Sequence, residues 1–169
     1  MNPALSAWNR SEPEPAVAAL LSCCAAERWA EQLVAMRPFA TEEELFAAAD
    51  RVWAEMQQPD WMQAFSAHPR IGDRKPAHAS ALSSSWSRQE QVSTEAAQTS
   101  VLTQLADGNQ SYEELFGFTY IICATGKSAE EMLQILNRRL DSDRPTELKE
   151  AAEQQRQITQ IRLRKWLQL

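Results

Sequence analysis

Apolar residues recur at helical spacing along most of this chain, and one stretch shows the pattern clearly. Six apolar side chains between residues 45 and 56 stand at positions that fall on one side of a helix: Leu45, Phe46, Ala49, Val52, Trp53 and Met56. Such residues share a face because every third or fourth side chain of an α-helix points the same way. We therefore expect a helix here, with this face against the hydrophobic core.

The same spacing predicts helices throughout the chain, and several of them start at a recognisable signal. Three capping-box matches pair a Ser or Thr hydroxyl with a Glu three residues later: Thr41 with Glu44, Ser87 with Glu90, and Ser128 with Glu131. Asp107, Gly108 and Asn109 have the composition of a helix end followed by a turn. After a lead-in segment, residues 1–12, the predicted helices cover residues 16–26, 29–36, 41–56, 58–67, 87–106, 111–116, 128–140 and 145–167.

Residues 118–123 depart from this pattern, because they are β-branched and aromatic. Alone, such a run is typical of a β-strand, but the sequence offers no second strand to pair with it. A helix or an extended segment is therefore predicted. Residues 72–86 are rich in Ser, Pro and Ala, and we expect a long loop there, a feature often tied to function. The predicted fold class is all-α: a single domain over residues 1–169, built as a bundle of roughly eight helices.

Composition and charge limit the classes of function. The 169 residues are 44% hydrophobic, as in ordinary soluble domains, and carry a formal net charge of −6. That charge argues against nucleic acid or an anionic membrane as the main partner, but it leaves a small-molecule substrate open. No apolar run is long enough to cross a bilayer, and the first residues lack the basic and apolar blocks of a secretory signal. We therefore expect a cytoplasmic protein.

The metal-binding residue types are sparse. Cys23, Cys24 and Cys123 are an odd number of cysteines without the spacing of a zinc site. Reduced thiols in a cytosolic protein are the simplest interpretation. The sequence also has no HxH, HExxH or clustered Asp and His residues, so no metal ion is predicted.

The most distinctive local feature holds one of only two histidines in the chain and consists of His68, Pro69, Arg70, Ile71, Gly72 and Asp73. Pro69 fixes its own backbone and restricts that of His68, so the imidazole stands on a stiff turn. An imidazole held in this way can act as a general acid or base near neutral pH. The same residues are also typical of a helix-ending turn, and the local sequence alone favours that structural interpretation.

Two further polar residues are candidates for chemistry. Glu90 near a helix start would give His68 a carboxylate partner, although it could instead be the capping-box carboxylate of Ser87. Arg162 in the last predicted helix could clamp a planar anionic or carbonyl-rich ligand, or it could be a surface arginine beside Arg164. Arg162 and Arg164 point about 200° apart on a helix, so only one of them can face a given pocket.

Five motifs then occur in a fixed order: His68-Pro69-Arg70-Ile71-Gly72, Ser87-x-x-Glu90-Gln91, Asn109-x-x-Tyr112-x-x-x-Phe116-Gly117-Phe118, Ile121-Ile122-Cys123-Ala124-x-Gly126-Lys127 and Arg162-Leu163. With these motifs the chain resembles the OHCU decarboxylase family over about residues 16–167. OHCU is 2-oxo-4-hydroxy-4-carboxy-5-ureidoimidazoline, the last intermediate between urate and (S)-allantoin. Each motif alone is weak, whereas the ordered set is specific.

The resemblance implies an all-helical, commonly dimeric carboxy-lyase without metal or organic cofactor. It implies that His68 is the catalytic proton donor, Glu90 the catalytic carboxylate and Arg162 the arginine that holds the substrate. The implied substrate-binding residues also include Pro69 beside His68 and those of two segments: Ser87 and Gln91, and Tyr120, Ile121, Ile122, Cys123 and Ala124. The stereospecific product would be (S)-allantoin. Thr119, Tyr120 and Leu115 depart from the residues usual in the family, but the acid and base residues are present.

Two other classes of function stay open at this point. A hydrolase acting on a related ureide would need an activated water, usually on a metal ion, and its signature motifs are absent from the sequence. A non-enzymatic helical module that binds allantoin without converting OHCU would retain a pocket but show no turnover. An assay of CO2 release, together with metal analysis, separates the three.

Overall fold

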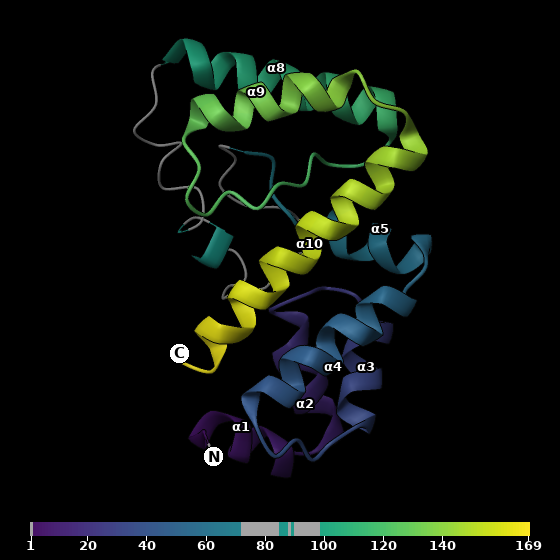
Figure 1. Ribbon diagram of the computed structural model, residues 1–169, viewed down its shortest axis with the longest axis vertical. Coiled ribbons are helices and arrows are strands. Elements are labelled where there is room, and N and C mark those ends of the chain that lie inside the picture. The colour runs from purple at the N-terminus through teal and green to yellow at the C-terminus, as the bar shows by residue number, and fades with distance from the viewer. Residues whose placement is uncertain (1, 72–84, 88, 90–98) are drawn as a thin grey trace. The chain divides into compact units, whose positions relative to one another are not determined.

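The computed structural model describes residues 2–71, 85–87, 89 and 99–169. Those parts of the chain contain helices and no β-strand, which confirms the predicted all-α fold class. The helices of eight or more residues are α1 (Pro3–Arg10), α2 (Pro13–Leu21), α3 (Glu27–Ala35), α4 (Glu42–Glu55), α5 (Gln58–Ser66), α8 (Thr99–Phe116), α9 (Ala129–Leu140) and α10 (Arg144–Trp166) (Figure 1). Most of the loop predicted over residues 72–86 lies outside the described residues.

The chain divides into two compact units. The first comprises Met1–Ala64 and Arg156–Leu169, and the second comprises Phe65–Gln155. Helix α10 supplies its first half to the second unit and its remainder to the first.

In the first unit, α2 packs against α3 and α3 against α4. The predicted core face of α4 is confirmed for five of its six residues, because only Phe46 is half-buried; the buried ones are Leu45, Ala49, Val52, Trp53 and Met56. Trp29 of α3 is fully buried, and its indole N–H donates to the Ala49 carbonyl over 3.1 Å. A buried indole needs such a partner, so this bond ties α3 to α4 in a defined register.

Of the two hydrogen bonds that the capping box of α4 predicts, the bond to the Thr41 hydroxyl is confirmed and the bond to the Glu44 carboxylate comes from a different residue. The Thr41 hydroxyl accepts the Glu44 N–H at 3.2 Å, as the motif predicts. The Glu44 carboxylate reaches past Thr41 and accepts the Ala40 N–H instead, at 2.8 Å. The helix start is therefore stabilised at the expected residue, while the reciprocal bond fixes the backbone one position earlier.

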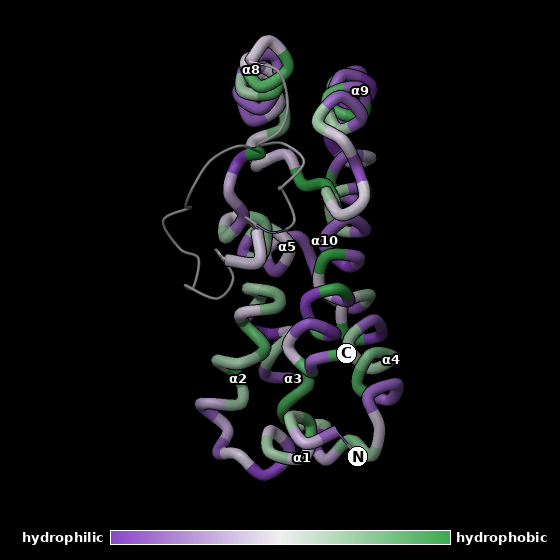
Figure 2. Tube along the Cα trace, turned by 90° about the vertical axis from the view of Figure 1, so that its left-hand side faces the viewer, coloured by the Kyte–Doolittle hydropathy of each residue, from purple (hydrophilic) through white to green (hydrophobic). Residues whose placement is uncertain are grey.

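In the second unit, α8 and α9 lie side by side, as Figures 1 and 2 both show. The helix end predicted at residues 107–109 is wrong, because α8 continues through them to Phe116. A Cβ atom on Gly108 would lie 2.6 Å from Cδ2 of Leu136 in α9, so this glycine permits close helix packing. Asn109 is also helical, and its side chain donates to the Leu105 carbonyl over 2.8 Å.

The chain between α8 and α9 is extended, which follows from the direction of the two helices. Both run from left to right in Figure 1, so the connection must return along the length of α8. Helix α8 has 18 residues, or about 27 Å at helical rise. An extended connection over residues 117–128 spans that distance with ease. It begins at Gly117, whose φ of +80° ends α8 in the left-handed conformation.

The extended segment confirms one of the two alternatives predicted for residues 118–123, because these residues are neither helix nor strand. The segment leads into the capping box at Ser128, which is complete. The Ser128 hydroxyl accepts the Glu131 N–H at 3.1 Å, and the Glu131 carboxylate accepts the Ser128 N–H at 2.7 Å. This signal fixes the start of α9 where the sequence predicts it.

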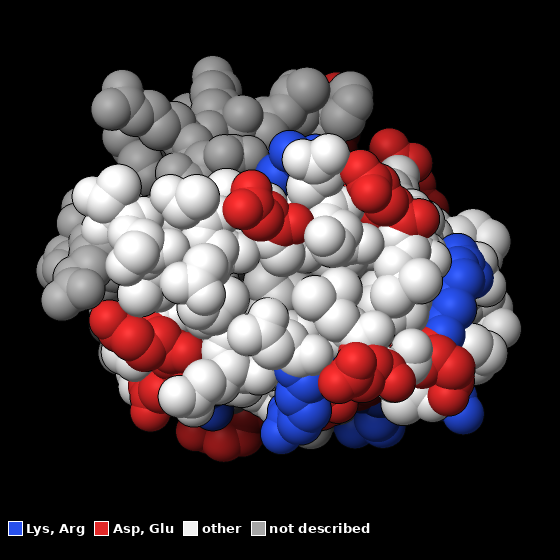
Figure 3. All heavy atoms as spheres, turned by 90° about the horizontal axis from the view of Figure 1, so that it is seen from above, with Lys and Arg blue, Asp and Glu red and all other residues white. Residues whose placement is uncertain are grey.

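The outer surface agrees with the acidic composition. Figure 3 shows the face over α8 and α9, where acidic side chains lie at several separate places, with uncharged surface and some Lys and Arg side chains between them. Exposed acidic residues on these helices include Glu114 and Glu130. Among the described helices, none combines the length and the apolar character needed to span a bilayer.

Candidate active site

The His68 turn lies directly after α5 and is held by its backbone and by a neighbouring side chain. The His68 N–H donates to the Phe65 carbonyl over 3.1 Å, and Pro69 is buried. Arg70 forms a two-point contact with the Glu113 carboxylate of α8, Nε to Oε1 at 2.8 Å and Nη2 to Oε2 at 2.5 Å. This paired geometry is specific for guanidinium and carboxylate, so it fixes the turn relative to α8.

The imidazole of His68 itself is in contact with α10. Its Nε2 lies 2.6 Å from Oε1 of Gln155, a side chain that is completely buried. Gln155 is not among the residues predicted from the sequence to form the site. A signal was present, because Gln155 falls on the same helical face as Leu148, Ala151 and Ile158, where an apolar residue would be expected.

The predicted binding segment, residues 120–124, is buried at every position. The Cys123 N–H donates to Oε1 of Gln154 over 2.8 Å, and Nζ of Lys127 donates to the Cys123 carbonyl over 2.8 Å. Gln154 precedes Gln155 on α10, and successive helical side chains point about 100° apart. One turn of α10 therefore holds both the His68 imidazole and the backbone of the segment.

A buried ion pair supports the same segment. Arg139 of α9 pairs with Glu147 of α10, Nε to Oε2 at 2.8 Å, and its Nη1 donates to the Ile121 carbonyl over 2.6 Å. The Tyr112 hydroxyl donates to the same Glu147 oxygen over 2.5 Å. Both partners of the ion pair are almost completely buried. Such a pair requires its hydrogen bonds to offset the cost of removing charge from water, and those bonds fix the Ile121 carbonyl.

Two phenols complete this cluster. Tyr112 bonds to Glu147, and the ring of Tyr120 lies 4.9 Å from the Arg139 guanidinium carbon. Burial raises the pKa of both Tyr112 and Tyr120, although the nearby charge of Arg139 opposes the shift. Both hydroxyls therefore keep their protons at neutral pH. The two phenols remain neutral hydrogen-bond donors beside the ion pair.

Arg162 belongs to the first unit and is buried, with 3% of its surface exposed. Burial raises the pKa of the Cys23 thiol to about 12 and of the Cys24 thiol to about 11, and the positive charge of Arg162 opposes both shifts. The neighbourhood of the Arg162 guanidinium thus includes two neutral thiols. Thr159, one turn earlier on α10, also hydrogen-bonds to Cys24.

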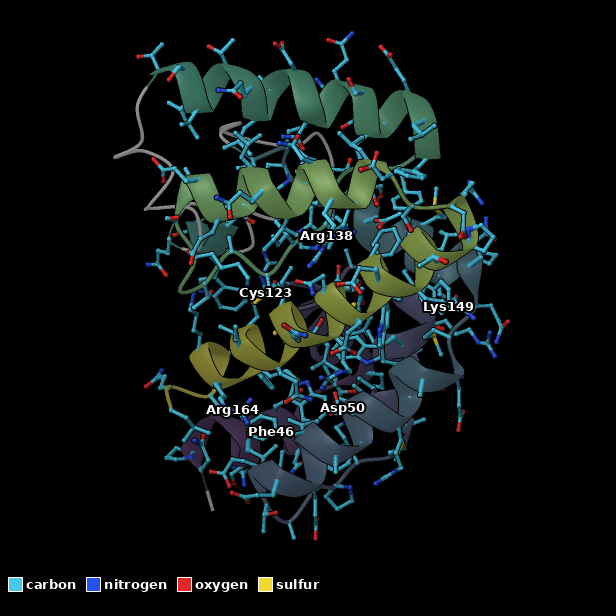
Figure 4. All side chains as sticks on the ribbon, turned by 45° about the horizontal axis from the view of Figure 1, so that its top comes forward. Phe46, Asp50, Cys123, Arg138, Lys149 and Arg164 are labelled. Carbon is cyan, nitrogen blue, oxygen red and sulfur yellow. The ribbon has the colours of Figure 1, made fainter. Side chains whose placement is uncertain are left out.

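Arg164 has a different environment from Arg162. It is exposed, and its guanidinium carbon lies 4.6 Å from the centre of the Phe46 ring. Figure 4 labels both residues. Its Nη1 also donates to the Gln160 carbonyl over 3.2 Å. Arg162 is therefore the buried arginine at this end of α10, and Arg164 is a surface residue over an aromatic ring.

The predicted segment at residues 87–91 is described only in part. Ser87 is buried and is already helical together with Ser85 and Trp86, so the prediction that it stands at a helix N-cap is wrong. This removes the N-cap residue on which the capping interpretation of Glu90 depended. Glu90 and Gln91 lie outside the described residues. Within the described parts of the chain, no three His, Cys, Asp or Glu side chains group in a way that could hold a metal ion.

Comparison with known proteins identifies relatives over most of the chain. The family model described as OHCU decarboxylase matches residues 9–164. The uric acid degradation bifunctional protein TTL of Arabidopsis thaliana is 35% identical over 147 residues, which cover 85% of this chain and 44% of that protein. The chain therefore spans less than half the length of this relative.

Other relatives are closer to this chain in length. The 2-oxo-4-hydroxy-4-carboxy-5-ureidoimidazoline decarboxylase of Haloferax volcanii is 25% identical over 134 residues, 79% of this chain and 77% of that protein. A crystal structure of OHCU decarboxylase in the presence of (S)-allantoin superposes with a TM-score of 0.77 at 32% identity, over 94% of this chain and 100% of the other. Since the family model covers nearly the whole sequence, the chain belongs to the OHCU decarboxylase family.

Proposed function

We propose that this chain is a carboxy-lyase that converts OHCU to (S)-allantoin and CO2 in the degradation of urate. The observation that carries this proposal is the family match over residues 9–164. The structural neighbour at 32% identity supports it, because that enzyme was crystallised in the presence of (S)-allantoin. The held imidazole of His68 adds a group of the right chemistry.

The reaction needs an electron sink and a controlled proton. The bond between C4 and the carboxylate breaks, CO2 leaves, and its electron pair forms a double bond between C4 and C5. The electrons of the C5=N bond move onto the ring nitrogen, which takes up a proton. The C4 hydroxyl then loses its proton and becomes a carbonyl, while C5 gains one, so the whole reaction consumes one proton. Because the substrate contains this C=N sink, we expect no cofactor.

The proposed roles follow the resemblance. His68 delivers the proton to one face of C5, which sets the S configuration, and Glu90 accepts the proton of the C4 hydroxyl. Arg162 holds the substrate through its guanidinium. The remaining binding residues are proposed to be Pro69, Ser87, Gln91, Tyr120, Ile121, Ile122, Cys123 and Ala124.

Two structural observations support this assignment for the groups of the second unit. His68 stands on a turn fixed by the Arg70–Glu113 contact, so its imidazole has little freedom to move. The backbone of residues 120–124 is held by Gln154 and Arg139, and a rigid row of amide groups suits a ligand that is itself mostly amide.

We also propose that the chain acts in the cytoplasm as a single-domain homodimer. All three cysteines are free thiols, which suits a reducing compartment. The dimer is expected from the resemblance. Light scattering at micromolar concentration tests the assembly, and a monomer mass would contradict it. One cooperative unfolding transition is the expected result for a single domain.

The deciding experiment generates OHCU in place from urate, with the enzymes that precede this step, and follows (S)-allantoin by circular dichroism. The chain should increase the rate of CO2 release and give one optical isomer, whereas a blank without the chain should give neither effect. Activity should survive dialysis against a chelator. Tight binding of allantoin without turnover would support the binding module instead.

The acid and base roles are tested by His68→Ala and Glu90→Ala. Each should lower turnover by about 100-fold or more, the usual contribution of a positioned acid or base, and the helical circular dichroism should be unchanged. His78→Ala, which removes the other histidine, is the matched control and should keep full activity. If either variant converts OHCU at the wild-type rate with the same optical purity, its assigned role is wrong.

A further inference from the structure

The contact between His68 and Gln155 defines which ring nitrogen of His68 carries a fixed proton. The Gln155 atom that faces the ring is the side-chain carbonyl oxygen, 2.6 Å from Nε2. A carbonyl oxygen only accepts hydrogen bonds, so Nε2 must be the donor. With this oxygen facing the ring, the hydrogen bond forms only when Nε2 carries a proton, whether the ring is neutral or charged.

We infer that Gln155 is a positioning residue that fixes His68 as the Nε2–H tautomer, so that His68 exchanges its catalytic proton at Nδ1. Only the catalytic use of the proton at Nδ1 rests on the proposed function. The tautomer itself is a property of the protein without substrate.

Burial makes Gln155 suited to this task. The side chain has no exposed surface and is attached to α10, a helix of 23 residues, so its amide cannot turn freely. In an enclosed site an acceptor that loses its donor costs about 1–3 kcal/mol. The alternative tautomer, with Nε2 unprotonated, would place two acceptors 2.6 Å apart.

The other contacts of the turn also restrict the movement of His68. Arg70 fixes the backbone beyond His68 through Glu113, and the His68 N–H is bonded to Phe65. With the main chain fixed on both sides, the Gln155 contact helps to fix the rotation of the ring. A defined rotation is what delivery of a proton to one face of C5 requires.

The first test reads the tautomer directly. Nitrogen-15 spectra of the histidine side chains, recorded at a pH where the ring is neutral, distinguish a protonated from an unprotonated nitrogen. The chain contains only two histidines, and His78→Gln assigns the signals. We expect His68 in the wild-type protein to be protonated at Nε2. An unprotonated Nε2 overturns the inference, whatever the activity of the protein.

The second test compares two substitutions of similar size. Gln155→Leu removes the acceptor, and Gln155→Glu keeps an oxygen at the same place. Gln155→Leu should give a mixture of tautomers and lower kcat about tenfold with little change in KM. The loss is smaller than the full contribution of a positioned acid, because His68 itself remains. Gln155→Glu should keep a proton at Nε2, and because its negative charge favours the charged ring, the pH profile of kcat should move to higher pH. Gln134→Leu, at an exposed glutamine of α9, is the control and should change neither the tautomer nor kcat.

These measurements separate the inference from the proposed function. If the wild-type protein shows the Nε2–H tautomer but does not convert OHCU, the positioning is supported and the function fails. If the protein converts OHCU but Gln155→Leu leaves both tautomer and kcat unchanged, the function stands and the inference is overturned. Should Gln155→Leu fail to fold, the wild-type spectrum and Gln155→Glu still decide.

Discussion

The guanidinium of Arg139 donates a 2.6 Å hydrogen bond to the backbone carbonyl of Ile121, which places a buried charge directly behind the proposed binding segment. The charge is balanced by Glu147 and not by solvent, since both side chains are almost completely buried. The position of the Ile121 carbonyl therefore depends on an ion pair between α9 and α10.

Removing one partner of this pair should destabilise the protein strongly. Glu147→Leu leaves the Arg139 charge buried without its carboxylate, and the expected loss is about 3–5 kcal/mol in the free energy of unfolding. Urea denaturation measures it. The control is Arg28→Met, which breaks the exposed pair of Arg28 and Asp60 and should cost less than about 1 kcal/mol. Equal losses in the two variants would contradict the structural role of the buried pair.

Gln154 allows the binding segment to be perturbed without touching a proposed catalytic residue. Gln154→Leu removes the acceptor of the Cys123 N–H, while Gln154→Glu retains an oxygen there. An amide that loses its buried partner costs about 1–3 kcal/mol, so Gln154→Leu should raise KM about tenfold with a smaller effect on kcat. Gln154→Glu should raise KM less, because it keeps the acceptor, although it loses the hydrogen bond from Gln154 Nε2 to the Glu150 carboxylate. Steady-state kinetics on freshly generated OHCU provides the comparison, and an equal rise of KM in both variants would argue against the hydrogen bond to Cys123.

Gly108 is predicted to be required for the packing of α8 on α9. Gly108→Ala favours the helix by about 1 kcal/mol, but the new methyl group would lie 2.6 Å from Cδ2 of the buried Leu136. Overpacking of this kind costs about 1–3 kcal/mol, so the net result should be a lower unfolding midpoint. In a Leu136→Ala background the same substitution should become neutral or stabilising. A destabilisation that persists there would mean that Leu136 is not the obstacle.

The helices of this protein could be predicted from the spacing of apolar residues, whereas the helix end at residues 107–109 could not. Asp-Gly-Asn is a strong local signal for a turn, and in isolation it would end a helix. The close contact of Gly108 with Leu136 outweighs that preference, and such a contact is invisible without the partner helix. The extended segment was ambiguous for the same reason, because its conformation follows from the direction of α9.

The residues of the candidate site also differ in how well the sequence predicted them. The proline-stiffened turn alone favoured a structural interpretation of His68, and both His68 and Arg162 became candidates through their places in an ordered set of motifs. Gln155 left a weak signal, a polar residue on the apolar face of α10. The pair of Arg139 and Glu147 gave no signal in the sequence, since the two residues lie on different helices and meet only once α9 and α10 pack together.

Alkaline pH should destabilise the first unit through its two buried thiols. The pKa of Cys23 and Cys24 is raised from 9.0 to about 12 and about 11, mainly by burial. Below pH 9 the thiols are protonated in both the folded and the unfolded protein, so they do not lower the free energy of unfolding. Above pH 9 only the unfolded chain ionises, so stability falls as pH rises, by at most about 1.4 kcal/mol per pH unit for each thiol.

The measurement compares urea midpoints at pH 7.5, 9 and 10. Tyr112 and Tyr120 ionise near pH 10 in the unfolded chain and add to the loss there, but the double cysteine variant retains both tyrosines, so the difference between the two proteins reports the thiols. The wild-type midpoint should fall between pH 9 and 10. The double variant Cys23→Ala with Cys24→Ala should show a smaller fall, although its stability at pH 7.5 is lower because two small cavities are left. An equal fall in both proteins would mean that other groups cause the alkaline loss.

Arg162 and Arg164 offer the sharpest matched pair for testing substrate binding. Arg162 is buried and Arg164 lies exposed over Phe46, although they are two residues apart on the same helix. Hydrogen bonds from a charged group contribute about 1.5–3 kcal/mol, so Arg162→Met should raise KM for OHCU about 10- to 100-fold. Arg162→Lys should be intermediate, because an ammonium keeps the charge but not the planar two-point geometry. Arg164→Met should leave KM within about twofold of wild type, as expected for a weak exposed contact. If Arg164→Met raises KM and Arg162→Met does not, the register of the substrate clamp is the opposite of the one proposed.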